Sequence, residues 1–323
     1  MSFPKVSVII PFFQEEKGIL IEAARSVLNQ KNFNNFEIIV VDDGSPVTAN
    51  EELANLTETG KAKIKIIRQE NAGPGAARNK GLDNVSKDIE YVAFLDSDDV
   101  WKDSHLENAI YALGKGYDFY FANFIPLITT KPQFDFRSFE VETHNMVDKE
   151  RGLYEFKGDF FTFLLQKNII GTSTVVYRYG KFPFLHFHKK LFNGEDYIFW
   201  LELSKLINKP VFSTNVECYY KEGINICSKS GWNSDRAVNY SYESMKFNTF
   251  ILKHFKFNQE QRKIINKRID AARHNFIASL LHDVRKKRNF PFDILLKQLR
   301  LDILTLPFIF SDLIRITGKK LFK

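Results

Sequence analysis

The chain has 323 residues, 44% of them hydrophobic, and this length allows either one large α/β domain or two smaller domains. Its two cysteines, Cys218 and Cys227, lack the spacing of a zinc site or a disulfide framework, which favours a reducing compartment. The apolar run Val6 to Ile10 is too short for a signal peptide, and no apolar run reaches the roughly 18 residues of a membrane span, so we expect a cytoplasmic protein that does not cross a bilayer.

The net charge of +7 is unevenly distributed. From Ile251 onward there are 17 Lys or Arg and 6 Asp or Glu, which leaves an excess of acids in the first 250 residues. A basic C-terminal part favours either an anionic partner, with phospholipid and nucleic acid as candidates, or a solvated helix face.

The first 125 residues alternate short β-branched runs with helical patterns, as βαβ units of a parallel sheet do. Apolar residues between Ile19 and Leu28 recur at helical spacing, a second helix is expected at Ala49–Leu56, and a third begins near Gly75. We therefore expect an α/β fold with a mixed, mainly parallel sheet flanked by helices. The expected strands are Val6–Ile10, Glu37–Val41, Lys63–Arg68, Glu90–Leu95 and Tyr117–Phe121.

The later part of the chain is less regular. Residues 126–157 are polar and aromatic, and we expect them to form a long loop, before order returns up to Tyr220. A long helix is expected from the capping residue Asn258 to the basic run Arg285 to Arg288. We expect one domain at residues 1–230, divided at residue 125, and a helical region at 231–323. The apolar stripe of the long helix is Ile265, Ile269, Ala272, Phe276, Leu280 and Val284.

Asp96-Ser97-Asp98 follows the fourth expected strand and places two carboxylates two residues apart. In an extended strand end, both can face a hard cation such as Mg²⁺ or Mn²⁺. Such a cation would let a diphosphate approach the carboxylates. An ordinary acidic turn has the same pattern, because Asp is common in turns.

Two further motifs follow expected strands. Asp42-Asp43-Gly44-Ser45 forms a tight turn, in which the carboxylates either cap backbone amides or accept a hydrogen bond from a nucleotide base. Asn71 to Asn79 is a Gly-rich turn that opens a helix, a geometry that presents amides to an anion. Because ligands bind at the carboxyl ends of parallel strands, we expect all three motifs at one edge of the sheet.

In this order, the motifs resemble those of the family 2 glycosyltransferases, which have the GT-A fold, and in particular the bacterial members that build surface polysaccharides. The resemblance extends from Pro4 to Leu113. The matching segments are Val6–Pro11, Ser26–Gln30, Glu37–Ser45, Gly73–Gly81 and Phe94–Trp101.

The resemblance implies a nucleotide-sugar-binding half in residues 1–125 and an acceptor half in residues 126–230. It implies that Asp43 contacts the base, that Arg78 supports the nucleoside pocket, and that Asp96 meets the ribose or the metal. Asp98 would meet the metal, Mn²⁺ or Mg²⁺. The family usually has Tyr-Asn where this chain has Phe13-Gln14, so a hydroxyl contact at position 13 is lost. The other residues expected at the nucleotide sugar are Pro11, Phe13, Glu15, Gly73 and Ser97.

Asn193 to Leu201 resembles the family's Glu-Asp signature, whose second acid, here Asp196, is usually the catalytic base, with Glu195 before it. A helix N-terminus favours acids in any case. The mechanism implied is one inverting displacement, in which an acceptor hydroxyl loses its proton to Asp196 and attacks the anomeric carbon while the metal steadies the leaving diphosphate. The family's later Tyr-Arg motif appears only as Tyr220-Lys221, so no phosphate role is assigned there.

The resemblance implies a hexosyl- or N-acetylhexosaminyl-transferase that uses a nucleotide-diphosphate sugar, a UDP-sugar being favoured. The expected acceptor is a glycan or a lipid-linked oligosaccharide in polysaccharide biosynthesis. A non-catalytic nucleotide-sugar or glycan-binding module would keep the pocket without turnover, and the presence of Glu195-Asp196 argues against it. A sugar-phosphate nucleotidyltransferase should show a Gly-rich, Arg-containing loop after the first strand, where this chain has Pro11 to Gln14.

The C-terminal tail mixes apolar and basic residues from Phe290 to Lys323. Its apolar residues between Ile294 and Phe310 exceed what one buried stripe needs. Peripheral attachment to an anionic membrane surface, where a lipid-linked acceptor would lie, is one hypothesis. Packing against the domain or against a homodimer partner is the other. So many aliphatic residues disfavour nucleic acid.

Overall fold

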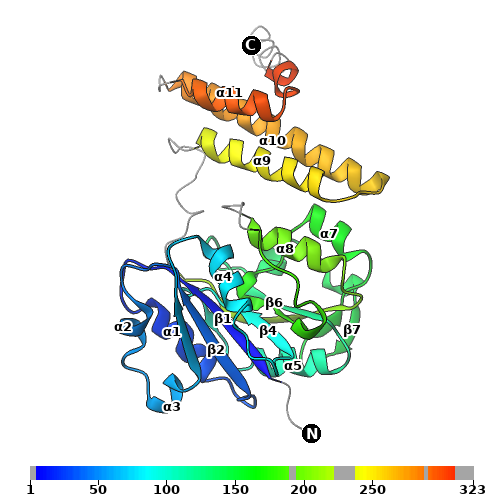
Figure 1. Ribbon diagram of the computed structural model, residues 1–323. Coiled ribbons are helices and arrows are strands. Elements are labelled where there is room, and N and C mark those ends of the chain that lie inside the picture. The colour runs from blue at the N-terminus through cyan, green and yellow to red at the C-terminus, as the bar shows by residue number, and fades with distance from the viewer. Residues whose placement is uncertain (1–4, 189–193, 222–236, 287–289, 310–323) are drawn as a thin grey trace. The chain divides into compact units, whose positions relative to one another are not determined.

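The computed structural model describes residues 5–188, 194–221, 237–286 and 290–309. The chain divides into two compact units, residues 1–224 and 225–323 (Figure 1). The domain boundary expected at residue 230 lies outside the described residues. Within the described part of the chain, no helix is long and apolar enough to span a membrane.

Four parallel strands in the order β3-β2-β1-β4 form the N-terminal half of the first unit's sheet. They are β1 Val6–Phe12, β2 Phe36–Asp42, β3 Ile64–Arg68 and β4 Tyr91–Phe94. Strands β1, β2 and β4 are buried along their length, as continuous β-branched runs predict. The helices of this half are α1 Ile19–Leu28, α2 Ala49–Leu53, α3 Glu58–Lys61, α4 Pro74–Leu82 and α5 His105–Gly114.

A short strand joins the two halves of the sheet. Strand β9, Val176–Tyr177, pairs antiparallel with both β4 and β6, which spans Phe119–Ile125. Strand β6 pairs in parallel with β10, Pro210–Tyr219, and β5, Val100–Trp101, pairs antiparallel with the end of β10. The α/β class with a mixed, mainly parallel sheet and flanking helices is confirmed. The remaining helical segments here are α6 Gln133–Phe136, η1 Val141–Thr143, α7 Phe160–Gln166, η2 Thr172–Thr174, η3 Tyr179–Lys181 and α8 Glu195–Ser204.

Residues 126–157 are more ordered than the long loop that we expected. They contain α6 and a hairpin of β7, Asn145–Asp148, and β8, Leu153–Glu155. Strand β8 pairs antiparallel with β10, so the hairpin extends the sheet at one edge. The prediction was wrong because an edge hairpin half exposed to water carries too few apolar residues to show alternation.

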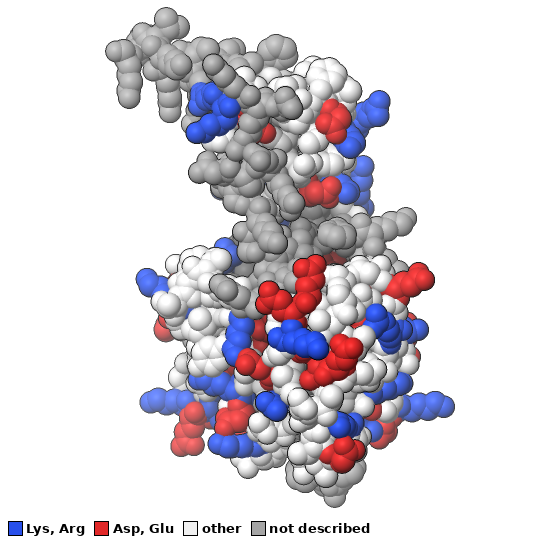
Figure 2. Space-filling model, turned by 90° about the vertical axis from the view of Figure 1, so that its left-hand side faces the viewer, with Lys and Arg blue, Asp and Glu red and all other residues white. Residues whose placement is uncertain are grey.

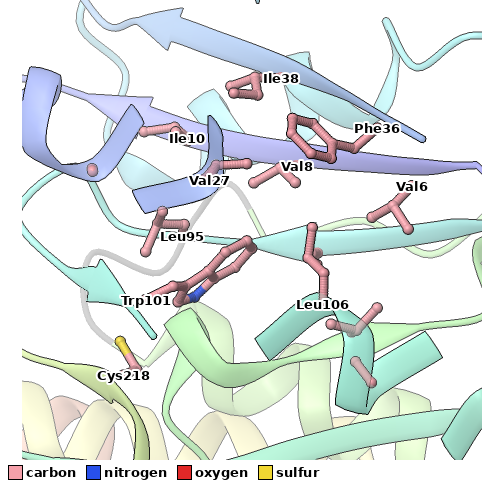
Figure 3. Packing of buried hydrophobic residues seen from close by; sticks show 14 of the residues in the cluster. Val6, Val8, Ile10, Val27, Phe36, Ile38, Leu95, Trp101, Leu106 and Cys218 are labelled. Carbon is pink, nitrogen blue, oxygen red and sulfur yellow. The ribbon is translucent and has the colours of Figure 1, made fainter. Parts of the chain in front are cut away.

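The main core of the first unit packs helices α1 and α5 against the sheet. Figure 3 shows Trp101 among these residues, with Leu95, Leu106 and Cys218 around its ring. Burying such aromatic and aliphatic side chains stabilises the fold by about 1.5–3 kcal/mol each. The core therefore fixes the ends of β1, β2 and β4, from which the motif loops emerge. On the face that Figure 2 shows, acidic and basic side chains of this unit lie side by side.

The second unit contains three described helices: α9 Ala237–His254, α10 Gln259–Arg285 and α11 Phe292–Leu301. Helix α10 begins as expected at Asn258, which forms a capping box with Gln261. Five of the six predicted stripe residues are buried, but Val284 is 52% exposed. The last turn of α10 buries Asp283 in its place, so the apolar stripe ends at Leu280. Of the basic run, Lys287 and Arg288 lie outside the described residues.

Candidate active site

Hydrogen bonds link the loops that follow β1, β2 and β4. The amide of Gln14 donates to Ser45 Oγ at 2.9 Å, and that hydroxyl donates to the carbonyl of Gln14 at 2.8 Å. The Gln14 side-chain amide donates to Ser97 Oγ at 3.4 Å. The predicted convergence of these motifs at one edge of the sheet is therefore present, because the strands that carry them are neighbours.

Both carboxylates of the second motif accept backbone hydrogen bonds. Asp42 accepts from the amides of Ser45 and Ala49, at 2.8 and 3.0 Å. Asp43 accepts from the amides of Ala72 and Gly73, at 2.9 and 2.8 Å, and from the side chain of Gln69. Asp43 thus holds the Gly-rich turn against β2, and a base contact would use the remaining lone pairs of its carboxylate.

The Gly-rich turn leads into α4 with the expected geometry. Gly73 has a φ of 88°, a left-handed conformation that favours glycine, and Pro74 is the first helical residue. At Gly75, a Cβ atom would lie 2.8 Å from Cγ of Glu195, so only glycine allows α8 to approach so closely. Two amides of this turn are occupied by Asp43, which leaves fewer of them for an anion than the sequence pattern suggests.

Arg78 of α4 connects the two acidic motifs. Its guanidinium donates to Asp96 Oδ1 at 2.7 Å and to Glu195 Oε1 at 3.0 Å. The Arg78 side chain is 5% exposed and the Glu195 side chain 9%, so the charges lie in a low-dielectric region. Burial, together with the charge of Asp196, raises the pKa of Glu195 to about 7, against the opposing effect of Arg78. Arg78 therefore contacts the carboxylates directly.

The loop where the metal is expected carries three carboxyl groups, those of Asp96, Asp98 and Asp99. Burial, with the charge of Asp96, raises the pKa of Asp98 to about 6. Burial and the charges of Asp96 and Asp98 raise the pKa of Asp99 well above its usual value. A site that resists holding several negative charges, and that offers only oxygen ligands, fits Mg²⁺ or Mn²⁺. Asp96 and Asp98 are the residues that would hold the ion.

Asp196 lies in the first turn of α8, after Gly194, whose φ is 83°. Its Oδ1 accepts from the amide of Tyr197 at 2.6 Å, and its Oδ2 accepts from the hydroxyl of Thr172 at 3.0 Å. The sequence motif did not predict Thr172, which lies 24 residues earlier in the chain. Glu195 points instead to Arg78, so the two acids of the signature have different surroundings.

The segment Ser26 to Gln30 has a structural role that motif reading missed. The Gln30 side chain donates to the carbonyl of Lys102 at 2.7 Å and accepts from the amide of Leu106 at 2.8 Å. Ser26 Oγ accepts from the amide of Trp101 at 3.2 Å. Helix α1 therefore holds the chain that follows the acidic loop. Repeated polar residues at the end of an amphipathic helix were the signal available in the sequence.

The other predicted nucleotide-sugar residues lie on the loops after β1 and β4. Pro11 is buried within β1, Phe13 is half-buried, and Glu15 is exposed. Ser97 is buried between Asp96 and Asp98 and accepts from Gln14, as described above. Tyr220 stacks on Phe124 with ring centroids 4.5 Å apart.

The mixed, mainly parallel sheet with flanking helices and an acidic D-x-D loop at its edge is the fold of the GT-A glycosyltransferases. The chain belongs to glycosyl transferase family 2, whose profile matches residues 7–185.

Curated relatives carry related descriptions. The chain is 51% identical over 105 residues to the succinoglycan biosynthesis protein ExoW of Rhizobium meliloti, which is 32% of this chain and 33% of that protein. It is 31% identical over 215 residues to an uncharacterized glycosyltransferase of Haemophilus influenzae, covering 65% of this chain and 76% of that protein. The match thus spans only about a third of ExoW.

Solved structures share the fold. S. aureus TarS 1–349 has a TM-score of 0.55 and 19% identity, with 88% of this chain and 87% of that chain covered. The mannosyltransferase PcManGT of Pyrobaculum calidifontis, in complex with GDP-Man and Mn²⁺, has a TM-score of 0.55 and 15% identity, with 95% and 83% covered. At these identities, the similarity establishes the fold alone.

Proposed function

We propose that the chain is an inverting transferase that moves a sugar from a UDP-sugar to a hydroxyl of a glycan or a lipid-linked oligosaccharide. The observation that carries the proposal is the pair of acidic motifs that Arg78 joins, one suited to a metal and one to a base. One displacement by an acceptor hydroxyl inverts the anomeric centre. The new bond joins the acceptor oxygen to the anomeric carbon, and the bond from that carbon to the diphosphate breaks.

Asp196 is the proposed base, and Glu195 supports it. A base needs a carboxylate held in one orientation, and the hydrogen bonds from Thr172 and Tyr197 hold the Asp196 carboxylate in this way. Glu195 is held by Arg78 and its side chain is buried, so it is poorly placed to receive a proton from an acceptor. Asp196 takes the proton of the acceptor hydroxyl as the anomeric carbon is attacked.

The donor is proposed to bind at the ends of β1, β2 and β4, with its diphosphate near Asp96 and Asp98. A bound Mn²⁺ or Mg²⁺ would offset the charge of the diphosphate as the nucleotide leaves. Pro11, Phe13, Glu15, Asp43, Gly73 and Ser97 are the proposed surroundings of the nucleotide sugar. S. aureus TarS has been solved with UDP and with UDP-GlcNAc, which supports a UDP-sugar, whereas PcManGT was solved with GDP-Man.

The experiment is a screen of UDP-, GDP- and dTDP-sugars for thermal stabilisation of the protein with Mn²⁺ present. A ligand at 100 times its dissociation constant adds about 2.7 kcal/mol to the stability. Release of the nucleoside diphosphate is then measured with and without glycan acceptors. Stabilisation by nucleotide sugars without any acceptor-dependent release would support the alternative, a non-catalytic binding module. Stabilisation by none of them would refute the proposed donor class.

Peripheral attachment to an anionic membrane is also proposed, through the C-terminal tail. Ile294 is buried against Phe276 and Leu280, so α11 contributes to the core of the second unit. Other apolar residues of the tail remain exposed, among them Phe292 at 62%, Ile303 at 66% and Leu304 at 54%. Residues 310–323, which include the last basic run, lie outside the described part of the chain.

The membrane proposal is tested by co-sedimentation with phosphatidylglycerol and phosphatidylcholine vesicles. Deleting the tail would also remove Ile294 from the core, so a variant with Ile303→Ser and Leu304→Ser is the better comparison. We expect the wild type to sediment with anionic vesicles at low salt and the variant to remain in solution. Equal recovery of both proteins in the supernatant would exclude the membrane and leave packing against the domain or a homodimer contact as the explanation of the exposed residues.

A further inference from the structure

Three consecutive hydroxyl side chains occupy the one-turn helix η2, and all three are buried. Thr172 donates to Asp196 Oδ2 at 3.0 Å. Ser173 donates to Asp99 Oδ2 and accepts from the amide of Asp96 at 3.0 Å. Thr174 donates only within its own turn, to the carbonyl of Gly171 at 2.8 Å. Two neighbouring residues thus contact the two acidic motifs, and the third does not.

We propose that Thr172 and Ser173 are positioning residues, which hold the base and the metal-binding loop at a fixed separation. The inference rests on the proposed function, in which Asp196 is the base and Asp96 and Asp98 hold the metal. It adds that η2 determines where these two groups stand relative to one another. Thr172 positions the proposed base, Asp196, and Ser173 positions the loop from Asp96 to Asp99.

The turn itself is held on two sides. The indole of Trp101 donates to the carbonyl of Ser173, and the ring of Trp101 is fixed in the core that Figure 3 shows. At Gly171, a Cβ atom would lie 2.6 Å from the hydroxyl of Tyr220 and 2.7 Å from Cε1 of Phe124, so backbone and aromatic rings are in close contact. Strand β9 begins two residues after η2 ends and pairs with β4 and β6. A shift of η2 would therefore disturb the sheet.

Thr172 completes the orientation of Asp196. A carboxylate on the first turn of a helix can rotate about its side-chain bonds, and the amide of Tyr197 fixes only Oδ1. The hydroxyl of Thr172 fixes Oδ2, which sets the plane of the carboxylate and leaves its other lone pairs for the acceptor. Because a small misplacement of a reacting group lowers the rate strongly, the loss of this bond should reduce kcat.

Ser173 forms hydrogen bonds with both ends of the acidic loop, residues 96–99. It binds the amide of Asp96, where the loop begins, and the carboxylate of Asp99, where it ends. The amide of Asp99 also donates to the carbonyl of Asp96 at 3.0 Å. Asp98 lies between these two attachments. Loss of the Ser173 hydroxyl should therefore weaken metal-dependent binding of the diphosphate, with a smaller direct effect on the base.

The experiment compares Thr172→Val, Ser173→Ala and Thr174→Val, which remove one buried hydroxyl each from the same turn. Thr174→Val is the matched control, because the carbonyl of Gly171 keeps its bond from the amide of Thr174 at 2.9 Å. We measure kcat and KM with the donor from the stability screen, and the affinity for UDP with Mn²⁺ by calorimetry. Ser173→Cys, which replaces the hydroxyl with a thiol that forms only weak hydrogen bonds, serves if Ser173→Ala does not fold.

The expected results differ between the positions. Thr172→Val should lower kcat by about 10-fold or more with the donor KM changed by less than about 2-fold, and Thr172→Ser should restore it. Ser173→Ala should weaken Mn²⁺-dependent UDP binding by about 10-fold, which is about 1.4 kcal/mol. Thr174→Val should leave both quantities within about 2-fold of the wild type. Equal effects of the three changes would overturn the inference, because they would report only on the stability of the turn.

Asp196→Asn separates this inference from the proposed function. If Asp196→Asn retains the wild-type kcat, the proposed base is wrong, whatever Thr172 does. If Asp196→Asn is slow but Thr172→Val is as fast as the wild type, only the positioning role fails. In an Asp196→Asn background, Thr172→Val should lower kcat no further, because the two residues act as one unit.

Discussion

The buried carboxyl of Glu195 predicts a pH dependence of stability that Glu195→Gln should remove. Burial raises its pKa from 4.5 to about 7, and the charge of Asp196 adds to this, although Arg78 opposes it. Between those two values, the folded protein binds more protons at this group than the unfolded chain does. The free energy of unfolding therefore falls as the pH rises through this window. Above about pH 7, this group causes no further decrease.

The magnitude follows from the width of the window. The interval from about pH 5.5 to pH 7 is about 1.5 units wide, and each unit corresponds to about 1.4 kcal/mol. The free energy of unfolding of the wild type should therefore fall by roughly 2 kcal/mol relative to that of Glu195→Gln. The other carboxylates of the site are present in both proteins, so most of their titration cancels in the comparison. The difference in the free energy of unfolding, wild type minus Glu195→Gln, should decrease by this amount between about pH 5.5 and pH 8.

Urea denaturation in EDTA at the two pH values measures this difference. Tryptophan fluorescence in a Trp232→Phe background reports on Trp101 and Trp200, which are both buried in the first unit. Glu58→Gln is the surface control, because the Glu58 side chain is 90% exposed. If this difference in the free energy of unfolding stayed constant or grew with pH, the ion pair with Arg78 would affect the pKa of Glu195 more than burial does, and the reasoning would be refuted.

Three further predictions concern the site and its support. Asp98→Ala should abolish metal-dependent turnover and weaken donor binding while the protein stays folded, and wild-type activity at full rate in excess EDTA would contradict the metal assignment. Asp196→Asn should lower kcat by about 100-fold with nearly unchanged donor affinity, and Glu195→Gln should cost less; the reverse order in folded proteins would exchange their roles. Gly81→Ala should destabilise the first unit by about 1–3 kcal/mol, because its Cβ would clash with Ile9 in β1, and an unchanged melting temperature would count against this.

The N-terminal half of the sheet could be predicted because three of its four parallel strands, β1, β2 and β4, are buried on both faces. Burial requires continuous β-branched runs, and those runs are visible in the sequence. In the C-terminal half, only β6 gave such a signal, as the expected strand Tyr117–Phe121. Strands β5 and β9 have two residues each, and the β7–β8 hairpin has one exposed side. These residues form strands because they pair with neighbouring strands, and their own β-propensity is not enough to predict them.

The positions of the site residues in the fold could be predicted, but the hydrogen-bond partners of their side chains could not. The order of the parallel strands places the motifs at one edge of the sheet whatever the loops do. Whether Asp43 faces a base or the amides of Ala72 and Gly73 depends on the path of a loop 29 and 30 residues away. In the same way, Arg78 was assigned to the nucleoside pocket, and the structure shows it bonded to Asp96 and Glu195.

Helix η2 shows why sequence reading stops at the motifs. Thr172, Ser173 and Thr174 look alike in the sequence, since three adjacent hydroxyl residues are typical of any turn. Their partners lie 24, 74 and 3 residues away, so only the folded sheet distinguishes the two that reach acidic groups from the one that does not. A motif names residues that perform the chemistry, whereas the residues that set the distance between two motifs belong to neither. The search for positioning residues in this family should therefore begin from the element that contacts both motifs, which here is the turn before β9.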